Sequence, residues 1–160
     1  MTMLAENRYD SLIAYYAERS GRDPRQIKRQ IRRESAFNPD AVSPAGCVGL
    51  AQFGTLTWSQ WWDGDGDLEP PPVGTKKLLD RRDPEDAIMA MCAYMVALEK
   101  RFSRLGYALA GYNMGPTALA RHLERLPAEE RLARWMEGLP KETRDYVVFC
   151  LGFDAEALVC

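Results

Sequence analysis

Glu34 is a carboxylate in a position where a negative charge is costly. It follows Ile27 and Ile31 at spacings that place all three side chains on one face of a predicted helix. Pro39 ends that helix soon afterwards, so Glu34 lies near a helix C-terminus, where the dipole disfavours negative charge. Burial and the dipole together predict a raised pKa, as a general acid requires. An ion pair with a neighbouring arginine would account for the same carboxylate.

The composition is that of a soluble globular protein. The chain has 160 residues, of which 46% are hydrophobic and 28% charged, which fits one domain over residues 1–160. The net charge of −2 lacks the basic excess of a nucleic-acid binder, and no apolar run approaches the roughly 18 residues of a membrane helix. We therefore expect neither a nucleic-acid nor a membrane partner. The chain is also expected to be a monomer. Residues 1–10 lack the pattern of a signal peptide.

Metal and thiol chemistry find little support in the sequence. The cysteines at 47, 92, 150 and 160 are far apart, and His122 is the only histidine, which excludes the usual zinc spacings. We expect no cofactor and no metal. Cys92 shares a helical stripe with Ile88 and Met95, which predicts a buried thiol. His122 is expected at the surface.

Helix signals dominate the rest of the chain. Asp23 and Pro24 supply the N-cap and first-turn proline of the Glu34 helix, and Gly115 and Pro116 end one helix and start the next. Helices are also predicted over residues 4–19, 83–104, 107–113, 128–137 and 142–152. No alternating strand is visible. The prediction is a mainly α fold of short helices, with an N-terminal helix in residues 1–22 and a catalytic core in residues 23–152.

Three separated segments carry the candidate chemistry. They are Glu34–Gln52 (ESAFNPDAVSPAGCVGLAQ), Ala110–Pro116 (AGYNMGP) and Glu142–Val147 (ETRDYV). In this order they resemble the catalytic domain of soluble lytic transglycosylases, a lysozyme-like family related to goose-type lysozymes that cleaves bacterial peptidoglycan. The resemblance covers roughly Ile27 to Leu151. It implies a single lysozyme-like domain whose short helices surround a substrate groove.

The resemblance implies a role for each matching residue. Glu34 matches the catalytic acid/base, and Ser43 matches a serine that reaches the substrate near the cleaved bond. The other matching positions are expected to bind substrate: Gln52, Thr57, Tyr112, Asn113, Glu142 and Tyr146. The tyrosine at 112 is expected near the catalytic carboxylate, and Glu142 is expected to contact substrate from across the groove.

The sequence departs from the family pattern beside the groove. Ala51 stands where members commonly carry methionine, and Gly54-Thr55 replaces the usual Met-Pro. These changes affect the wall that shapes the sugar sites and leave the catalytic position untouched. A short chain without a visible signal peptide resembles phage-borne members more than periplasmic ones. That implies a virion-associated or endolysin-like antimicrobial protein, present in the host cytoplasm before release.

The chemistry can be judged from the residues as well. Most glycosidases need two carboxylates, whereas a lytic transglycosylase can use one. Its acid protonates the bond between N-acetylmuramic acid and N-acetylglucosamine, and the resulting carboxylate takes the proton of the 6-hydroxyl that attacks the anomeric carbon. The product is a 1,6-anhydro sugar, with no water consumed. Asp40 reads as a turn residue and Glu142 as a helix N-terminal acid, so neither is an evident second catalytic carboxylate.

The same sequence allows other functions and other roles for several residues. The enzyme could be a goose-type-lysozyme-like hydrolase that uses water, or the chain could be an inactive wall-binding protein of a virion or secretion apparatus. Trp58, Trp61 and Trp62 could stack on sugars or fill the core. The acidic loop Asp63–Asp67 could bind calcium, although it fails the EF-hand pattern. Tyr112 and Asn113 could serve only the turn at Gly115.

Overall fold

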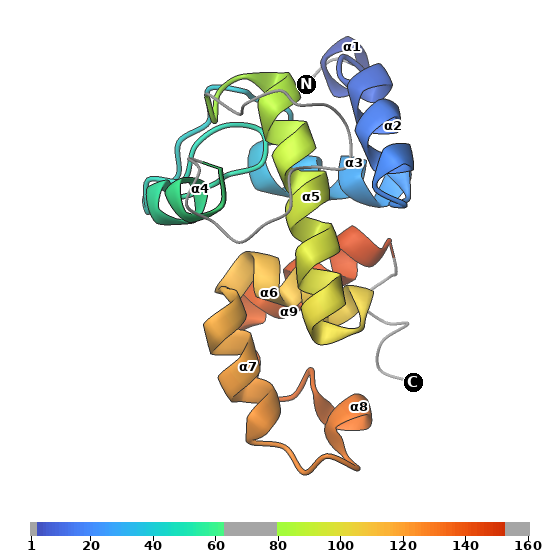
Figure 1. Cartoon of the computed structure of the whole chain (residues 1–160), viewed down its shortest axis with the longest axis vertical. Helices are drawn as coiled ribbons and strands as arrows, with labels where there is room; N and C mark the ends of the chain where they lie inside the picture. Colours follow the sequence, from blue (N-terminus) through green and yellow to red (C-terminus); the bar gives the residue numbers. More distant parts are fainter. Residues whose placement is uncertain (1–2, 63–79, 153–160) are drawn as a thin grey trace. The chain divides into compact units, whose positions relative to one another are not determined.

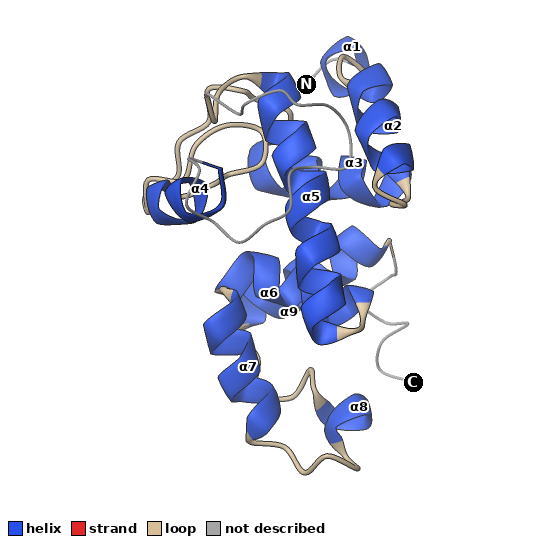
Figure 2. Ribbon diagram, in the orientation of Figure 1, coloured by secondary structure: helices blue, strands red, loops and turns tan. Residues whose placement is uncertain are grey.

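The computed structural model describes residues 3–62 and 80–152, and helices joined by loops make up these ranges (Figure 1). Figure 2 shows no strand within these ranges, where the β pairing consists of isolated bridges from Val48 to Val42 and to Phe53. The predicted mainly α fold class is therefore confirmed. None of the helices in the described ranges combines the length and apolarity needed to span a bilayer. The chain forms two compact units, Met1–Val96 and Ala97–Cys160. The single-domain organisation stays a prediction.

The N-terminal helix differs from its prediction. In place of one helix over residues 4–19, the first unit begins with α1 (Met3–Glu6) and α2 (Asp10–Arg19). A turn separates them, in which the Asp10 N–H donates to the Asn7 carbonyl at 3.2 Å. Local helix propensity gave no sign of this break. The predicted stop is confirmed, because α2 ends at Arg19 and Gly21 follows with a φ of 66°.

Helix α3 (Pro24–Ser35) follows the predicted cap and first-turn proline. The Asp23 carboxylate accepts the Arg25 N–H at 2.9 Å, which satisfies one of the unpaired donors at the helix start. Ile27 and Ile31 are fully buried, and each contributes roughly 1.5–3 kcal/mol through the apolar surface it removes from water. Helix α2 packs against α3, and ion pairs join Asp10 to Lys28 at 2.8 Å and Glu6 to Arg32.

A long loop connects α3 to α4 (Thr55–Trp62), and α5 (Pro84–Phe102) follows beyond the undescribed stretch. The calcium hypothesis for Asp63–Asp67 falls outside the described residues. Cys92 lies on α5, is 1% exposed, and so is the buried thiol that the sequence predicts. Burial raises the pKa of this thiol to about 12. Neighbouring α5 side chains, including Ile88, Met91 and Met95, are fully buried in the same core.

The second unit is built around α6 (Leu105–Met114), which packs against both α7 (Pro116–Glu124) and α9 (Lys141–Leu151). Gly111 permits a close approach to α7 and to the end of α5, since a Cβ there would already touch Leu119 and Phe102 at 3.4 Å. The predicted helix over residues 128–137 shrinks to α8 (Arg131–Arg134). The predicted break at Gly115 is confirmed, with a φ of 92°.

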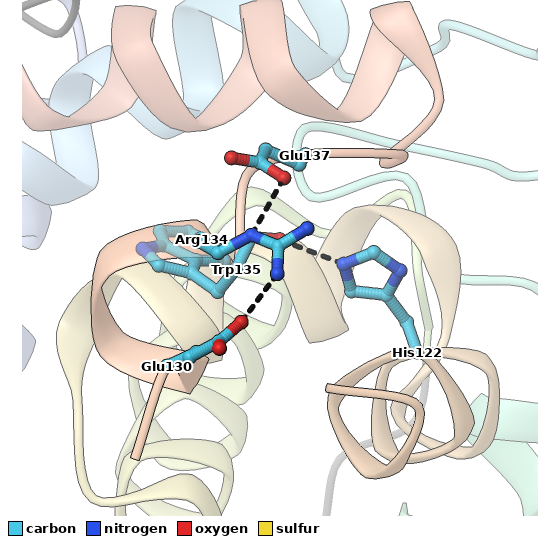
Figure 3. Close-up of polar contacts among 5 residues, drawn as sticks. All are labelled: His122, Glu130, Arg134, Trp135 and Glu137. Carbon is cyan, nitrogen blue, oxygen red and sulfur yellow. Dashed lines mark hydrogen bonds and ion pairs between the residues drawn. The ribbon is translucent and has the colours of Figure 1, made fainter. Parts of the chain in front are cut away.

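The segment around α8 is held by contacts that reach back along the chain (Figure 3). His122 is half-buried, and its Nε2 lies 2.7 Å from the Trp135 carbonyl oxygen, so the expectation of a plain surface histidine is wrong. The Trp135 ring packs edge-on against Tyr107 at 4.9 Å. Arg134 bonds both Glu130 and Glu137, and these carboxylates raise the pKa of its guanidinium. The contacts of Trp135 with His122 and Tyr107 are tertiary, whereas the two ion pairs of Arg134 are local.

Candidate active site

Glu34 occupies the second-to-last position of α3 and is half-buried. The helix stops one residue later, after Ser35, because Ala36 turns into the left-handed conformation with a φ of 50° and its N–H returns to the Arg32 carbonyl at 3.0 Å. Phe37 also has a positive φ, 62°, and its ring is buried. Left-handed backbone is costly for residues other than glycine and is often retained near functional groups. The predicted placement of Glu34 at a helix end is confirmed.

Ser35 connects the helix of Glu34 to the loop that follows. Its hydroxyl lies 2.9 Å from the Leu50 carbonyl oxygen and 3.2 Å from the Ile31 carbonyl oxygen. The serine is 9% exposed and Leu50 is fully buried, so this contact satisfies polar groups that solvent hardly reaches. It fixes the end of α3 against residues that are 15 positions later in the chain.

The residues Ala41–Phe53, here named the substrate loop, carry two of the predicted binding residues. Ser43 closes a turn in which its N–H donates to the Cys47 carbonyl at 2.9 Å and its Oγ accepts the Cys47 N–H at 3.0 Å. Because Oγ acts as the acceptor in this bond, the hydroxyl keeps its own proton to donate elsewhere. Ser43 is half-buried, and its predicted contact with substrate stays a prediction.

Gln52 braces the substrate loop from inside. Its Nε2 donates to the Ala41 carbonyl at 3.0 Å and to the Gly49 carbonyl at 2.9 Å. Both amide hydrogens are thereby used within the loop, so only Oε1 can face a ligand, as an acceptor. The backbone at Gln52 is left-handed, with a φ of 54°. The geometry thus gives Gln52 a structural task besides the binding role that the sequence predicts.

Trp58, on the helix that follows the substrate loop, belongs to the core. Trp58 is 6% exposed, and its ring packs against Phe53 at 5.6 Å, while Phe53 in turn packs against Tyr94 at 5.9 Å. Of the two readings left open for Trp58, the structure favours core packing over stacking on a sugar. Thr57, its neighbour on α4, is half-buried. The side chains of Trp61 and Trp62 lie outside the described residues.

Asp40 is a turn residue, as expected. It is exposed, and its N–H donates to the Asn38 side-chain oxygen at 3.0 Å. The side chain that closes the turn is therefore that of Asn38, and Asp40 contributes its backbone. In the ranges 3–62 and 80–152, no three His, Cys, Asp or Glu side chains cluster in a way that could hold a metal ion.

The second unit brings the other predicted residues onto two packed helices. Tyr112 and Asn113 lie in the last turn of α6, and both are half-buried. Thr143, in the first turn of α9, donates its hydroxyl to the Asn113 Oδ1 at 2.8 Å. Glu142 is exposed beside it. The second and third sequence motifs are therefore joined through Asn113 and Thr143.

Tyr146 lies one turn further along α9 and is 2% exposed. Such burial favours a packing role within the unit, and its predicted contact with substrate stays a prediction. Ser35 and Thr143 were missed as site residues. Their signal was present, because each directly follows a glutamate that the motifs single out, but a hydroxyl partner 15 or 30 residues away cannot be seen from local sequence.

Known proteins resemble the chain in sequence. Residues 11–133 match the family model described as the Transglycosylase SLT domain. That span contains the first two motifs and ends before Glu142. The membrane-bound lytic murein transglycosylase F of Desulfosudis oleivorans is 35% identical over 115 residues, 68% of this chain and 22% of that protein. The soluble lytic murein transglycosylase of Salmonella typhimurium is 31% identical over 154 residues, 92% of this chain and 22% of that protein.

Solved structures resemble the chain as well. The 70 kDa soluble lytic transglycosylase of Escherichia coli matches with a TM-score of 0.68 and 25% identity over 89% of this chain and 23% of that one. An inactive mutant of the lytic transglycosylase Slt of Pseudomonas aeruginosa matches with a TM-score of 0.68 and 26% identity over 91% and 23%. The lysozyme-like fold is confirmed, and the chain spans under a quarter of the length of these relatives. The family match covers most of the chain, and the chain belongs to the Transglycosylase SLT domain family.

Proposed function

We propose that this chain is a peptidoglycan lytic transglycosylase that cleaves the β-1,4 bond between N-acetylmuramic acid and N-acetylglucosamine. The observation that carries the proposal is the placement of Glu34. It is the second-to-last residue of a helix whose last residue, Ser35, is bonded to the loop that holds Ser43 and Gln52. Membership in the family and the names of the relatives support the same activity.

In the proposed reaction Glu34 acts twice. As a carboxylic acid it gives its proton to the glycosidic oxygen, and the bond from that oxygen to the anomeric carbon of the muramic acid breaks. The substrate's N-acetyl oxygen stabilises the electron-poor carbon. The Glu34 carboxylate then takes the proton of the muramic acid 6-hydroxyl while the oxygen of that hydroxyl bonds to the anomeric carbon. The acid is regenerated, a 1,6-anhydro sugar forms, and no water is consumed.

The binding roles belong to the proposal too. The Ser43 hydroxyl has a proton to donate and the Gln52 Oε1 can accept, so this pair can recognise an acceptor and a donor of one sugar. Thr57 on α4 and Tyr112, Asn113, Glu142 and Tyr146 in the second unit are proposed as further binding residues through the family resemblance. Holding the 6-hydroxyl close to the anomeric carbon favours ring closure over attack by water.

Product analysis tests the activity. Purified peptidoglycan digested by the chain should yield muropeptides with 1,6-anhydromuramic ends in mass spectrometry. Reducing ends would establish the hydrolase instead, and the absence of any product from a correctly folded chain would overturn the proposed activity. The expected association with a phage stays a prediction of the sequence.

A further inference from the structure

Arg81 contacts the substrate loop from a distant part of the first unit. Its Nη1 donates to the Phe53 carbonyl oxygen at 3.0 Å, across 28 residues of chain. The same oxygen accepts the Val48 N–H at 3.1 Å. A guanidinium bond to a carbonyl in a half-buried place is stronger than a neutral one, because the donor is charged. Arg81 therefore holds the end of the loop at which Gln52 is followed by Phe53.

The backbone of Arg81 contacts the loop a second time, at Gly49. A Cβ built on Gly49 would collide with the Arg81 carbonyl oxygen and would lie 3.0 Å from its carbonyl carbon. Gly49 also has a φ of 87°, so glycine is required here for both conformation and space. The loop is thus held on the Arg81 side at Gly49 and at Phe53, and Gln52, with its left-handed backbone, lies between the two contacts.

The segment that carries Arg81 is itself fixed to α5. The Asp80 N–H donates to the Asp86 carboxylate at 3.2 Å, and the Arg82 N–H donates to the Asp80 carboxylate at 2.8 Å. Asp86 is 2% exposed in the first turn of α5. Arg81 consequently projects from a support that does not depend on the substrate loop, as a part that positions the loop must.

We propose that Arg81 is a positioning residue of the transglycosylase reaction, which fixes Gly49–Phe53 so that the Gln52 Oε1 meets the sugar in one orientation. The inference rests on the proposed function. Arg81 need not touch substrate. Its two contacts oppose the tendency of Gln52 to leave the left-handed conformation, which an L-residue rarely adopts. Loss of the guanidinium should therefore impair substrate binding and placement.

The test compares Arg81→Ala and Arg81→Lys with Arg82→Ala, whose side chain is exposed on the neighbouring residue. Initial rates on soluble glycan strands give kcat and KM separately, and thermal unfolding is followed in parallel. For Arg81→Ala we expect a fall in kcat/KM of about tenfold, mostly through KM, as for the loss of one charge-assisted bond. Arg81→Lys should lie between it and the parent, and Arg82→Ala should equal the parent.

A second readout separates positioning from stability. At a temperature well below unfolding, ethylguanidinium at a low, non-denaturing concentration should restore part of the Arg81→Ala activity and leave Arg82→Ala unchanged. Parental kcat/KM in Arg81→Ala, or a loss that follows only the unfolding temperature without rescue, would overturn the inference. If Arg81→Ala does not fold, Arg81→Lys alone decides it, and a parental KM overturns it. An inactive parent would overturn the proposed function as well, whereas an active parent isolates the role of Arg81.

Discussion

The Ser35 hydroxyl lies 2.9 Å from the Leu50 carbonyl oxygen, and this contact ties the helix of the candidate acid to the loop of the candidate binding residues. Glu34 precedes Ser35 directly, and Gln52 is two residues beyond Leu50. A shift of the substrate loop would therefore move Ser35 and, with it, the Glu34 carboxylate. The left-handed residues Ala36 and Gln52 follow the two partners in sequence, one residue after Ser35 and two residues after Leu50, and the bonds around this contact offset their strain.

Ser35→Ala tests this link. Removing the hydroxyl leaves the buried Leu50 carbonyl without this donor, so we expect a loss of about 1–2 kcal/mol in the free energy of unfolding. Activity on peptidoglycan should fall beyond what stability alone explains, because the loop can drift relative to Glu34. Denaturant unfolding and initial rates measure both. Ser11→Ala, an exposed change on α2, should leave both unchanged. Equal behaviour of the two variants would contradict the link.

Thr143 and Asn113 offer the corresponding test in the second unit. Thr143→Val keeps the shape of the buried side chain and removes the donor to the Asn113 Oδ1, so it should cost about 1 kcal/mol of stability. Thr143→Ser keeps the hydroxyl and should retain the bond. If the bond orients Asn113 for substrate, kcat/KM should fall in the valine variant and recover in the serine variant. Parental stability in Thr143→Val would show that the contact contributes nothing.

The N-cap of α3 predicts a pH effect. The bonds from the Arg25 side chain and backbone lower the pKa of Asp23 below its ordinary 3.8. A lowered folded-state pKa stabilises the fold above the unfolded pKa, and this contribution is lost as the pH falls through the folded pKa. Asp23→Asn keeps a capping oxygen, so it should remove only the part of the stability that is lost when the Asp23 carboxylate is protonated. Asp23→Ala should cost about 1 kcal/mol at neutral pH. Urea unfolding at pH 7 and pH 3 distinguishes the two, and identical losses would refute the cap.

Cys92 predicts a change at high pH. Burial raises its pKa from 9.0 to about 12, so the folded state keeps a proton that the unfolded chain gives up. Stability from this thiol is complete below pH 9 and is lost as the pH rises from 9 towards 12. Relative to Cys92→Ala, the parent should lose about 1.4 kcal/mol per pH unit in that window.

A thiol reagent gives an independent check on the cysteines. Of the three cysteines in the described ranges, Cys47 is half-buried and should react before the others, whereas Cys92 and Cys150 are buried and should react only on unfolding. Cys47→Ser should remove the fast native-state reaction of this thiol. Rapid reaction of Cys92 in the native state would contradict its burial.

Local signals predicted the helix boundaries that local chemistry decides. Asp23 and Pro24 start α3, and Gly115 and Pro116 separate α6 from α7, because caps, glycines and prolines act within one turn. The break after α1 and the shortness of α8 depend on contacts with other helices. His122 illustrates the difference, since its partner at Trp135 is 13 residues away.

The candidate site divides in the same way. Motifs predicted six of the candidate residues, and the structure adds how Ser43, Gln52 and Asn113 are held. The other three are Glu34, Tyr112 and Glu142. Arg81 stands in no motif, and its bond to Phe53 spans 28 residues, so no pattern in the sequence could indicate it. Trp58 was ambiguous because an aromatic residue beside a motif suits a sugar or a core equally well, and only its packing on Phe53 decides between them.

Comparing the release of anhydro-muropeptides by the parent and by Glu34→Gln tests most directly whether Glu34 is the catalytic acid. Because glutamine keeps the size of the side chain, the variant should fold like the parent. It cannot give a proton to the glycosidic oxygen. Its rate should fall by roughly 100- to 10,000-fold, the range for loss of general acid–base catalysis. Glu18→Gln, at an exposed position of α2, should match the parent. Anhydro product formed by Glu34→Gln at the parental rate would show that Glu34 is not the catalytic acid.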